Sequence, residues 1–510
     1  MKATRILALI LACLMLCSAF LVSCGDDGKE KGTAPIVTPT VDTEDKSEVY
    51  EAEVKKLNGH TFHFLTRDAG NNWHLSTQAV YAEENTGDKV NDAVFSRNAQ
   101  LEQIYDCKIT ADARTNPVTD FREAIIAGDY VGDFIMYTVN SSKSMATGGL
   151  LVDFATLDNI DLTKAWWDQE ANNAINMGLK TFFVTGDAAT MDDRACWMLA
   201  FNKDIIDEWA ATAMPSGFSI YETVKKGEWT VDLMAKIITE TARDMDGDGV
   251  ITKQNKDRFG LTTETSTNWY LLAATGVTVS NKSATGEYSL PDALKPEVLT
   301  AWEALRGIIA SPYRYVTDIG TYFRANGKAT FYSCNYGMAL RLANAVVPIG
   351  YLPYPKLNKE QKDYLITCSF SQCGVYMIPS TVENAETKDW LTNGFTSAAE
   401  QCAYFLEAFA YYSRHTVTPA FVDQVLLKQA VFDADSADMI TLSLANKVYD
   451  PVIAKSFGSI NVFSAASKAN TFGAEKFDQI TSLYAEKLEA ARTSLKEYID
   501  YISVEQLPEA

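Results

Sequence analysis

Histidine is scarce in this chain, and the common catalytic motifs are missing. The 510 residues include only four histidines: His60, His63, His74 and His415. None belongs to an HExxH motif or accompanies a GxSxG serine, and the chain has no Walker-type phosphate loop. The residues therefore give no support to zinc peptidase, serine hydrolase or ATPase chemistry.

Paired cysteine motifs and excess positive charge are also missing. Six cysteines of the main body have no CxxC spacing and no neighbouring histidine, which argues against zinc: Cys107, Cys196, Cys334, Cys368, Cys373 and Cys402. Cys368 and Cys373 are the closest pair, and the sequence leaves open whether they form a disulfide. With 45 Lys and Arg against 66 Asp and Glu, the formal charge is −21. Such a chain repels nucleic acid and anionic lipid headgroups.

The N-terminus has the layout of a secretory signal. A basic start, Met1 to Arg5, precedes an apolar run from Ile6 to Val22. The segment Leu21 to Gly25 resembles a bacterial lipobox, in which Cys24 is acylated after cleavage. We expect a signal peptide over residues 1–23, with a single membrane-spanning helix as the alternative. No later apolar run reaches membrane-spanning length.

A polar segment separates this signal from the body of the chain. Residues 24–56 start with the lipidated cysteine and are rich in Gly, Pro, Thr and charge, without apolar periodicity. Such a segment cannot bury enough apolar surface to order itself, so it suits a flexible tether. The chain beyond it is too long for one core, and two lobes or more are expected.

Strand and helix patterns alternate along the body. The sequence predicts strands at His60–Thr66, Cys107–Thr110 and Asp133–Tyr137, and helices at Val94–Tyr105 and Phe121–Ala127. This order predicts an α/β fold with a largely parallel sheet. Further helices are predicted at Thr230–Arg243, with Thr230 as N-cap, and at Pro296–Ile309, Ala398–Ser413 and Ala474–Ile502.

Four segments resemble one family, the extracellular solute-binding proteins of family 1, which are maltose-binding-protein-like subunits of ABC importers. They are Gly132–Tyr137 with Gly149–Phe154 as a strand-loop-strand, Phe201–Ile206, Gly227–Thr230 before a helix, and Gly327–Phe331 with Val347–Pro355. Together they follow the family order along much of the chain. The resemblance implies a lipid-anchored, monomeric, extracytoplasmic binder of carbohydrate, expected to be an oligosaccharide, that works with importer permease subunits.

The resemblance also implies a two-lobed periplasmic-binding-protein-like fold, with crossing hinge strands and an interlobe ligand cleft. The crossings are expected near Met191–Ala195, Ser371–Tyr376 and Phe432–Asp438. Lobe 1 is then residues 57–190 with 375–431, and lobe 2 is residues 191–374 with 432–510. Lobes that close on a ligand give a hinge mechanism.

An acidic loop resembles the start of a calcium-binding loop. Asp244, Asp246 and Asp248 alternate, and glycine and the backbone carbonyl of Val250 follow. The twelfth position, which an EF-hand fills with Glu, is Asn255. Asp257 resembles the closing Asp of the family's own loop, and the identity of the closing ligand stays open. The sequence predicts a structural Ca²⁺ site here, with a solvated acidic turn as the alternative.

Sugar sites combine aromatic rings with polar side chains that take the hydroxyl groups. By resemblance and by position after strands, the predicted ligand contacts are Arg67, Trp73, Tyr137, Asn140, Glu264, Ser266, Trp269, Asn335 and Tyr336. For Trp269, packing at a helix start is the alternative. Trp166 and Trp167 are expected to pack rather than bind. We predict no catalytic residue and no catalytic cofactor.

Two other functions are alternatives to an importer subunit for an exported, lipid-anchored chain of this kind. A ligand-presenting sensor lipoprotein has the same fold and is not separated from an importer subunit by sequence. A secreted glycoside hydrolase needs two carboxylates across the scissile bond, and the many acidic residues do not exclude it.

Overall fold

The computed structural model describes most of the chain from residue 48 onward. The described ranges are 48–67, 79–176, 180–189, 191–252, 257–264, 266–283, 288–316, 321–339, 342, 344–368, 372–385, 394–422, 433–450 and 477–503. They all belong to a compact unit that starts at Val37. The predicted signal peptide, Cys24, most of the tether and Trp73 lie outside the described residues. No helix within these ranges has both the length and the hydrophobicity to cross a bilayer.

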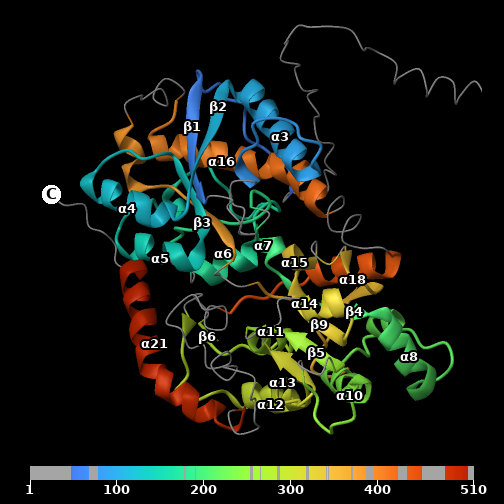
Figure 1. Cartoon of the computed structure of the whole chain (residues 1–510). Helices are drawn as coiled ribbons and strands as arrows, with labels where there is room; N and C mark the ends of the chain where they lie inside the picture. The colour runs from blue at the N-terminus through green and yellow to red at the C-terminus, as the bar shows by residue number, and fades with distance from the viewer. Residues whose placement is uncertain are drawn as a thin grey trace, which may run out of the picture. The chain divides into compact units, whose positions relative to one another are not determined.

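Four strands form the first sheet, in the order β11-β3-β1-β2 (Figure 1). Strand β1 runs parallel to β2 and β3, whereas β11 is antiparallel to β3. The strands are β1 (His60–Arg67), β2 (Cys107–Arg114), β3 (Phe134–Thr138) and β11 (Gly374–Met377). The helices connected to them are α3 (Lys89–Tyr105), α4 (Pro117–Ala127), α5 (Val139–Thr147), α6 (Gln169–Asn176), α16 (Ala398–His415) and α17 (Val417–Pro419).

Aromatic packing fixes helix α16 against this sheet. Alternation along β1 turns Phe62 and Phe64 to one face, where both are fully buried. The ring of Phe62 stacks on that of Phe405, with centroids 3.8 Å apart, and Phe64 stacks on Phe409 at 5.3 Å. The helix begins at a capping residue, Ser397, whose side chain accepts the backbone N–H of Glu400.

Five strands form the second sheet, in the order β10-β4-β9-β5-β8. Strand β5 is parallel to β8 and β9, and β4 is antiparallel to both β9 and β10. The strands are β4 (Trp197–Asn202), β5 (Phe259–Thr263), β8 (Arg314–Val316), β9 (Ala329–Asn335) and β10 (Ile349–Leu352), and a separate hairpin pairs β6 (Asn281–Lys282) with β7 (Tyr288–Ser289). Two mixed sheets with connecting helices confirm the predicted α/β class.

The helices of this second part follow its strands. They are α7 (Met191–Arg194), α8 (Lys203–Ala213), α9 (Ile220–Lys225), α10 (Val231–Thr241), α11 (Thr267–Ala274), α12 (Pro296–Ala304), α13 (Arg306–Ile309), α14 (Thr321–Asn326), α15 (Tyr336–Ala339) and α18 (Ala434–Leu444). The C-terminal helix α21 (Ile480–Ser503) is anchored on the segment before α12, because Tyr484 donates to the carbonyl of Pro291 over 2.9 Å.

The chain passes between the two sheets three times. It leaves the first sheet after β3, returns at β11, and leaves again between α16 and α18. Helix α18 belongs to the second part because the Ser436 hydroxyl accepts the backbone N–H of Tyr351 in β10. The predicted crossing near Ser371–Tyr376 overlaps β11 and the one near Phe432–Asp438 overlaps α18, and the crossings and lobe limits stay predictions.

Local details correct the sequence-based assignments. The segment between β3 and Gly149 was expected to be a loop, but α5 occupies it, because Met145 and Ala146 are fully buried. The helix predicted over Pro296–Ile309 is interrupted at Leu305 and resumes as α13. Thr230 stands at the N-cap of α10, but its side chain makes no capping hydrogen bond.

Candidate functional site

Five of the predicted ligand contacts lie at one edge of the second sheet. Parallel β5 and β9 end at this edge, and antiparallel β4 begins there with Trp197. Loops beyond the carboxyl ends of parallel strands are the usual place for ligands in α/β folds. Glu264, Ser266, Trp269, Asn335 and Tyr336 all lie at or just after these strand ends.

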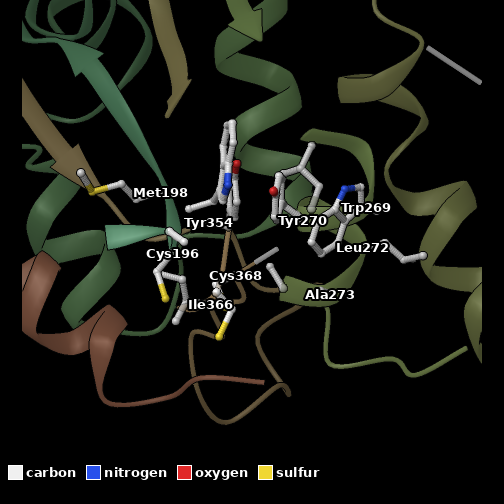
Figure 2. Packing of buried hydrophobic residues seen from close by; sticks show 14 of the residues in the cluster. Cys196, Met198, Trp269, Tyr270, Leu272, Ala273, Tyr354, Ile366 and Cys368 are labelled. Carbon is white, nitrogen blue, oxygen red and sulfur yellow. The ribbon is translucent and has the colours of Figure 1, made fainter. Parts of the chain in front are cut away.

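Aromatic rings fill the protein interior at this edge. Tyr270 stacks on Trp197 with ring centroids 4.4 Å apart, and its other neighbour is Trp269 at 3.7 Å. Figure 2 shows Trp269 and Tyr270 side by side on helix α11. Each of the three side chains is at most 2% exposed. Tyr336 is also fully buried, and burial raises the pKa of its hydroxyl well above the usual range.

Three buried N–H donors at this edge have no hydrogen-bond partner among the described residues. They are Nε1 of Trp197, Nε1 of Trp269 and Nδ2 of Asn335. The amide of Asn335 is held in place, because its Oδ1 accepts the backbone N–H of Met338 over 2.8 Å. Buried polar groups in native proteins are nearly always paired, so these three unpaired donors need an explanation.

Several other buried polar groups of this region are paired with one another. Thr267 and Ser333 share a hydrogen bond of 2.9 Å between their hydroxyls, and Ser333 shares another of 2.6 Å with Tyr354. Four other well-buried tryptophans each donate their indole N–H: Trp167 to Glu407, Trp209 to Glu240, Trp229 to the carbonyl of Pro353 and Trp302 to that of Phe477. The unpaired donors at this edge suit a ligand that presents acceptor oxygens. Buried side-chain atoms without a partner also occur elsewhere among the described residues, including Nε1 of Trp166.

Trp197 and Tyr270 were not predicted as part of this site. Trp197 enters it only through antiparallel pairing with Asn335, a contact between residues far apart in sequence. Tyr270 follows Trp269 in a helix that is apolar on all sides, so periodicity gives it no distinct role. The sequence signal that could have identified Tyr270 is its position directly after Trp269, which makes an aromatic pair at the end of the predicted Glu264–Trp269 segment.

The remaining predicted contacts belong to the first sheet. Arg67 ends β1 and Tyr137 lies near the end of parallel β3, so both are at the same edge of that sheet. The Arg67 guanidinium lies 5.8 Å from the ring centre of Tyr137, within reach of a cation–π interaction. Asn140 follows in the first turn of α5, and its Oδ1 is buried. Trp73 lies outside the described residues.

The acidic loop brings three carboxylates together. Oxygens of Asp244, Asp246 and Asp257 all lie within 4.8 Å of one another. Asp257 is fully buried and accepts the backbone N–H groups of Met245 and Thr252, which fixes it at the closed end of the loop. Oxygen ligands from carboxylates at this spacing fit a hard cation such as Ca²⁺.

The loop backbone also shapes the charge of this cluster. Asp244 accepts the N–H groups of Gly249 and Gly247, which lowers the pKa of its carboxyl group. Asp248 accepts the N–H of Val250 over 2.8 Å and is not among the three clustered carboxylates. Asp248 and the carbonyl of Val250 stay predicted ligands.

A separate pocket of about 310 Å³ lies where the passages between the sheets meet. It is lined by Trp166, Trp167, Asp168, Asp187, Asp193, Arg414 and Lys447, among others. Lys447 contacts Asp193 at 2.6 Å and Asp168 at 3.5 Å, and Arg414 contacts Asp187 at 3.0 Å. The rings of Trp166 and Trp167 are buried, and both residues also line this pocket. The two cations of this pocket, Lys447 and Arg414, are therefore paired with aspartates, and Glu170 also lines it.

Comparisons with known proteins gave structural likenesses only. No family model matches the chain, and no curated protein matches it. Among solved structures, the chain is similar to the ABC substrate-binding protein Lmo0181 from Listeria monocytogenes in complex with cycloalternan (13% identity, 88% of this chain, 100% of that chain, TM-score 0.45). It is also similar to UgpB from Mycobacterium tuberculosis in complex with glycerophosphocholine (14% identity, 87% of this chain, 98% of that chain, TM-score 0.49). A third similar structure is the maltose/maltodextrin-binding domain MalE from Bdellovibrio bacteriovorus bound to maltotriose (12% identity, 87% of this chain, 98% of that chain, TM-score 0.41).

Proposed function

We propose that the chain is an extracytoplasmic solute-binding protein that captures a carbohydrate, expected to be an oligosaccharide, and delivers it to an ABC importer. The observation that carries this proposal is the set of unpaired donors on Trp197, Trp269 and Asn335, with the ring of Tyr270 in contact with both indoles. Sugar hydroxyl oxygens accept hydrogen bonds, and their CH faces pack on aromatic rings.

Capture by closure of two lobes follows from the same proposal. The two sheets are joined by three passages of the chain, and the predicted contacts are divided between an edge of each sheet. Arg67, Tyr137 and Asn140 would serve from lobe 1, and the β9 edge from lobe 2. A hinge at the passages would let ligand binding favour one arrangement of the lobes.

Lipid anchoring at Cys24 is supported by the lipobox-like sequence and the polar segment behind it. Palmitate labelling of cells that express the full chain tests this point. Label should appear on the protein and be lost in a Cys24→Ala variant, and equal labelling of both proteins would refute the anchor.

A structural Ca²⁺ in the Asp244 loop is part of the proposal. The clustered carboxylates of Asp244, Asp246 and Asp257 support it. The loop joins α10 to β5, so the ion would hold the start of the second sheet in place and would take no part in chemistry.

Calorimetric titration of the purified chain with neutral sugars and oligosaccharides tests the central proposal. We expect binding without turnover, and loss of sugar uptake when the gene is deleted. Release of sugar products would support a hydrolase instead. Binding of only cations or phosphate would exclude a carbohydrate site, and unchanged uptake with intact binding would favour a sensor.

A further inference from the structure

Cys196 and Cys368 lie directly opposite each other in an antiparallel backbone bridge. The bridge has a backbone hydrogen bond from Trp197 N–H to the carbonyl of Thr367, 3.3 Å long, one residue beyond the pair on each strand. This pattern marks the narrow, non-hydrogen-bonded kind of antiparallel pair, whose Cα atoms lie about 4.5 Å apart. Disulfides span Cα separations of about 4.4–6.8 Å, so the backbone is already in range.

The side chains of the two cysteines also meet. Directly opposite residues project to the same face of a strand pair, and the thiols of Cys196 and Cys368 are in hydrogen-bond contact. Both residues are fully buried, and Figure 2 shows them in one apolar cluster. All six described cysteines are free thiols in this structure.

The other described thiols have different neighbours. Cys107 contacts the carbonyl of Leu101, Cys373 that of Gly374, and Cys402 the carboxylate of Asp133. Cys334 lies in β9 opposite Met198. Cys368 therefore has Cys196 as its structural neighbour, although Cys373 is closer in sequence.

We propose that Cys196 and Cys368 form a disulfide bond when the protein folds in an oxidising compartment outside the cytosol. The bond would form by exchange with a disulfide-bearing thiol oxidant. The two cysteine thiols lose two protons and two electrons, one S–S bond forms between them, and the oxidant's S–S bond is reduced to two thiols. Disulfides persist in such compartments and not in the reducing cytosol.

The position of this bond gives it a mechanical role. Cys196 follows α7 on the first passage between the sheets, and Cys368 precedes β11 on the second. The closed loop would contain all five strands of the second sheet, β4 to β10. A bond closing so long a loop restricts the unfolded chain strongly, and it would also tie two passages together at the proposed hinge.

Burial sets the time at which the bond can form. Contact with Cys368 and burial raise the pKa of the Cys196 thiol, so little reactive thiolate exists in the folded protein. The exchange should therefore take place during folding, before the second sheet closes over the pair. Once formed, the bond should resist reductants until the protein unfolds.

Peptide mapping of the exported full chain tests the proposal. The protein is denatured, alkylated without reduction and digested, and a cross-linked peptide joining Cys196 to Cys368 is expected, two hydrogen atoms lighter than the separate peptides. In a Cys196→Ala variant Cys368 should become alkylated, whereas a Cys334→Ala control should keep the cross-link. Alkylation of both cysteines in the exported wild type, or a bond from Cys368 to Cys373, would overturn the proposal.

Thermal unfolding provides an independent measurement. Adding a thiol reductant during unfolding should lower the melting temperature of the exported wild type by several degrees and leave the Cys196→Ala variant unchanged. An equal response of both proteins would contradict the bond. Sugar binding is measured separately, so failure of the carbohydrate proposal would not be mistaken for failure of this one.

Discussion

Asn335 and Trp197 face each other across the antiparallel pairing of β9 and β4, and each has a buried N–H group without a partner among the described residues. The pairing is made by backbone, so these side chains are positioned without using their own donors. Trp269 has a third such donor, and its ring contacts Tyr270, which stacks on Trp197. All three side chains are at most 1% exposed, so a ligand would reach these donors only through a movement of the surrounding chain.

Replacing the indole donors should affect binding more than folding. Trp197→Phe and Trp269→Phe each remove an N–H group that makes no bond within the described protein and retain an aromatic ring. We expect sugar affinity to fall about 3- to 10-fold for each, the usual value of one hydrogen bond. The melting temperature should fall less than in the Trp229→Phe variant, because all three lose the same ring volume but these two lose no hydrogen bond within the described protein. Calorimetry and thermal unfolding measure the two effects.

Trp229→Phe is the matched control for this experiment. The indole of Trp229 is fully buried, but it donates to the carbonyl of Pro353 over 2.9 Å. The variant should lose about 1 kcal/mol more folding stability than the other two, because that carbonyl loses its donor, and it should bind sugar normally. If all three variants lose stability equally and keep their affinity, the unpaired donors do not contact ligand.

The acidic loop should bind calcium through Asp244, Asp246 and Asp257. At a hundredfold excess over Kd, binding to the native state alone should stabilise the protein by about 2.7 kcal/mol. We expect chelation of fully loaded protein to lower the melting temperature and Asp244→Asn to abolish that response. Glu123→Gln, at an exposed carboxylate on α4, is the control and should respond as wild type. No change on chelation would leave the loop an acidic turn.

Glu407 should make stability depend on pH near neutrality. Burial raises the pKa of this carboxyl group, and the hydrogen bond from Trp167 lowers it by less. The net result is a rise from 4.5 to about 7. The folded protein therefore holds the proton more tightly than the unfolded chain. The stabilising contribution is fully present below pH 4.5 and is lost as the pH rises through 7.

The size of this effect follows from the two pKa values. A difference between 4.5 and about 7 corresponds to roughly 3 kcal/mol of unfolding free energy. In Glu407→Gln the side chain is neutral at every pH, so its stability relative to wild type should rise by about that amount from pH 4.5 to pH 8. Urea unfolding across this range measures it. Parallel pH profiles for the two proteins would show that Glu407 does not titrate in this range.

Much of the fold could be predicted because local patterns and packing agree. The alternation in β1 and the apolar face of α16 appear in the structure with nearly the expected bounds. The segment of α5 was misread because its Asn and Ser residues favour turns, whereas burial of Met145 stabilises the helix. The break at Leu305 precedes Gly307, whose missing side chain lets α13 lie close to Ala235 of α10.

The candidate site was harder to predict than the fold. Asn335 and Trp269 could be named from the segments around them, but Trp197 joins them only through pairing of distant strands. In the same way, Cys368 meets Cys196 across the sheet passages, while the thiol of its sequence neighbour Cys373 contacts the carbonyl of Gly374. Sequence distance is a poor measure of such contacts, because the sheet order is set by the whole fold.

Lys447 should stabilise the contact between the passages of the chain. Its ammonium lies 2.6 Å from Asp193 in α7 and 3.5 Å from Asp168 before α6, and all three side chains are less than 20% exposed. Lys447→Met keeps the apolar stem but leaves two partly buried carboxylates without this cation. We expect a loss of about 1–3 kcal/mol of unfolding free energy, between the values of exposed and buried ion pairs.

Lys225→Met is the control, because Lys225 also contacts two aspartates but is more exposed, and the stability lost in this variant should be much smaller. Adding Asp193→Asn to Lys447→Met should restore part of the stability in urea unfolding. Equal losses for the two lysine variants would show that Lys447 makes only a surface ion pair.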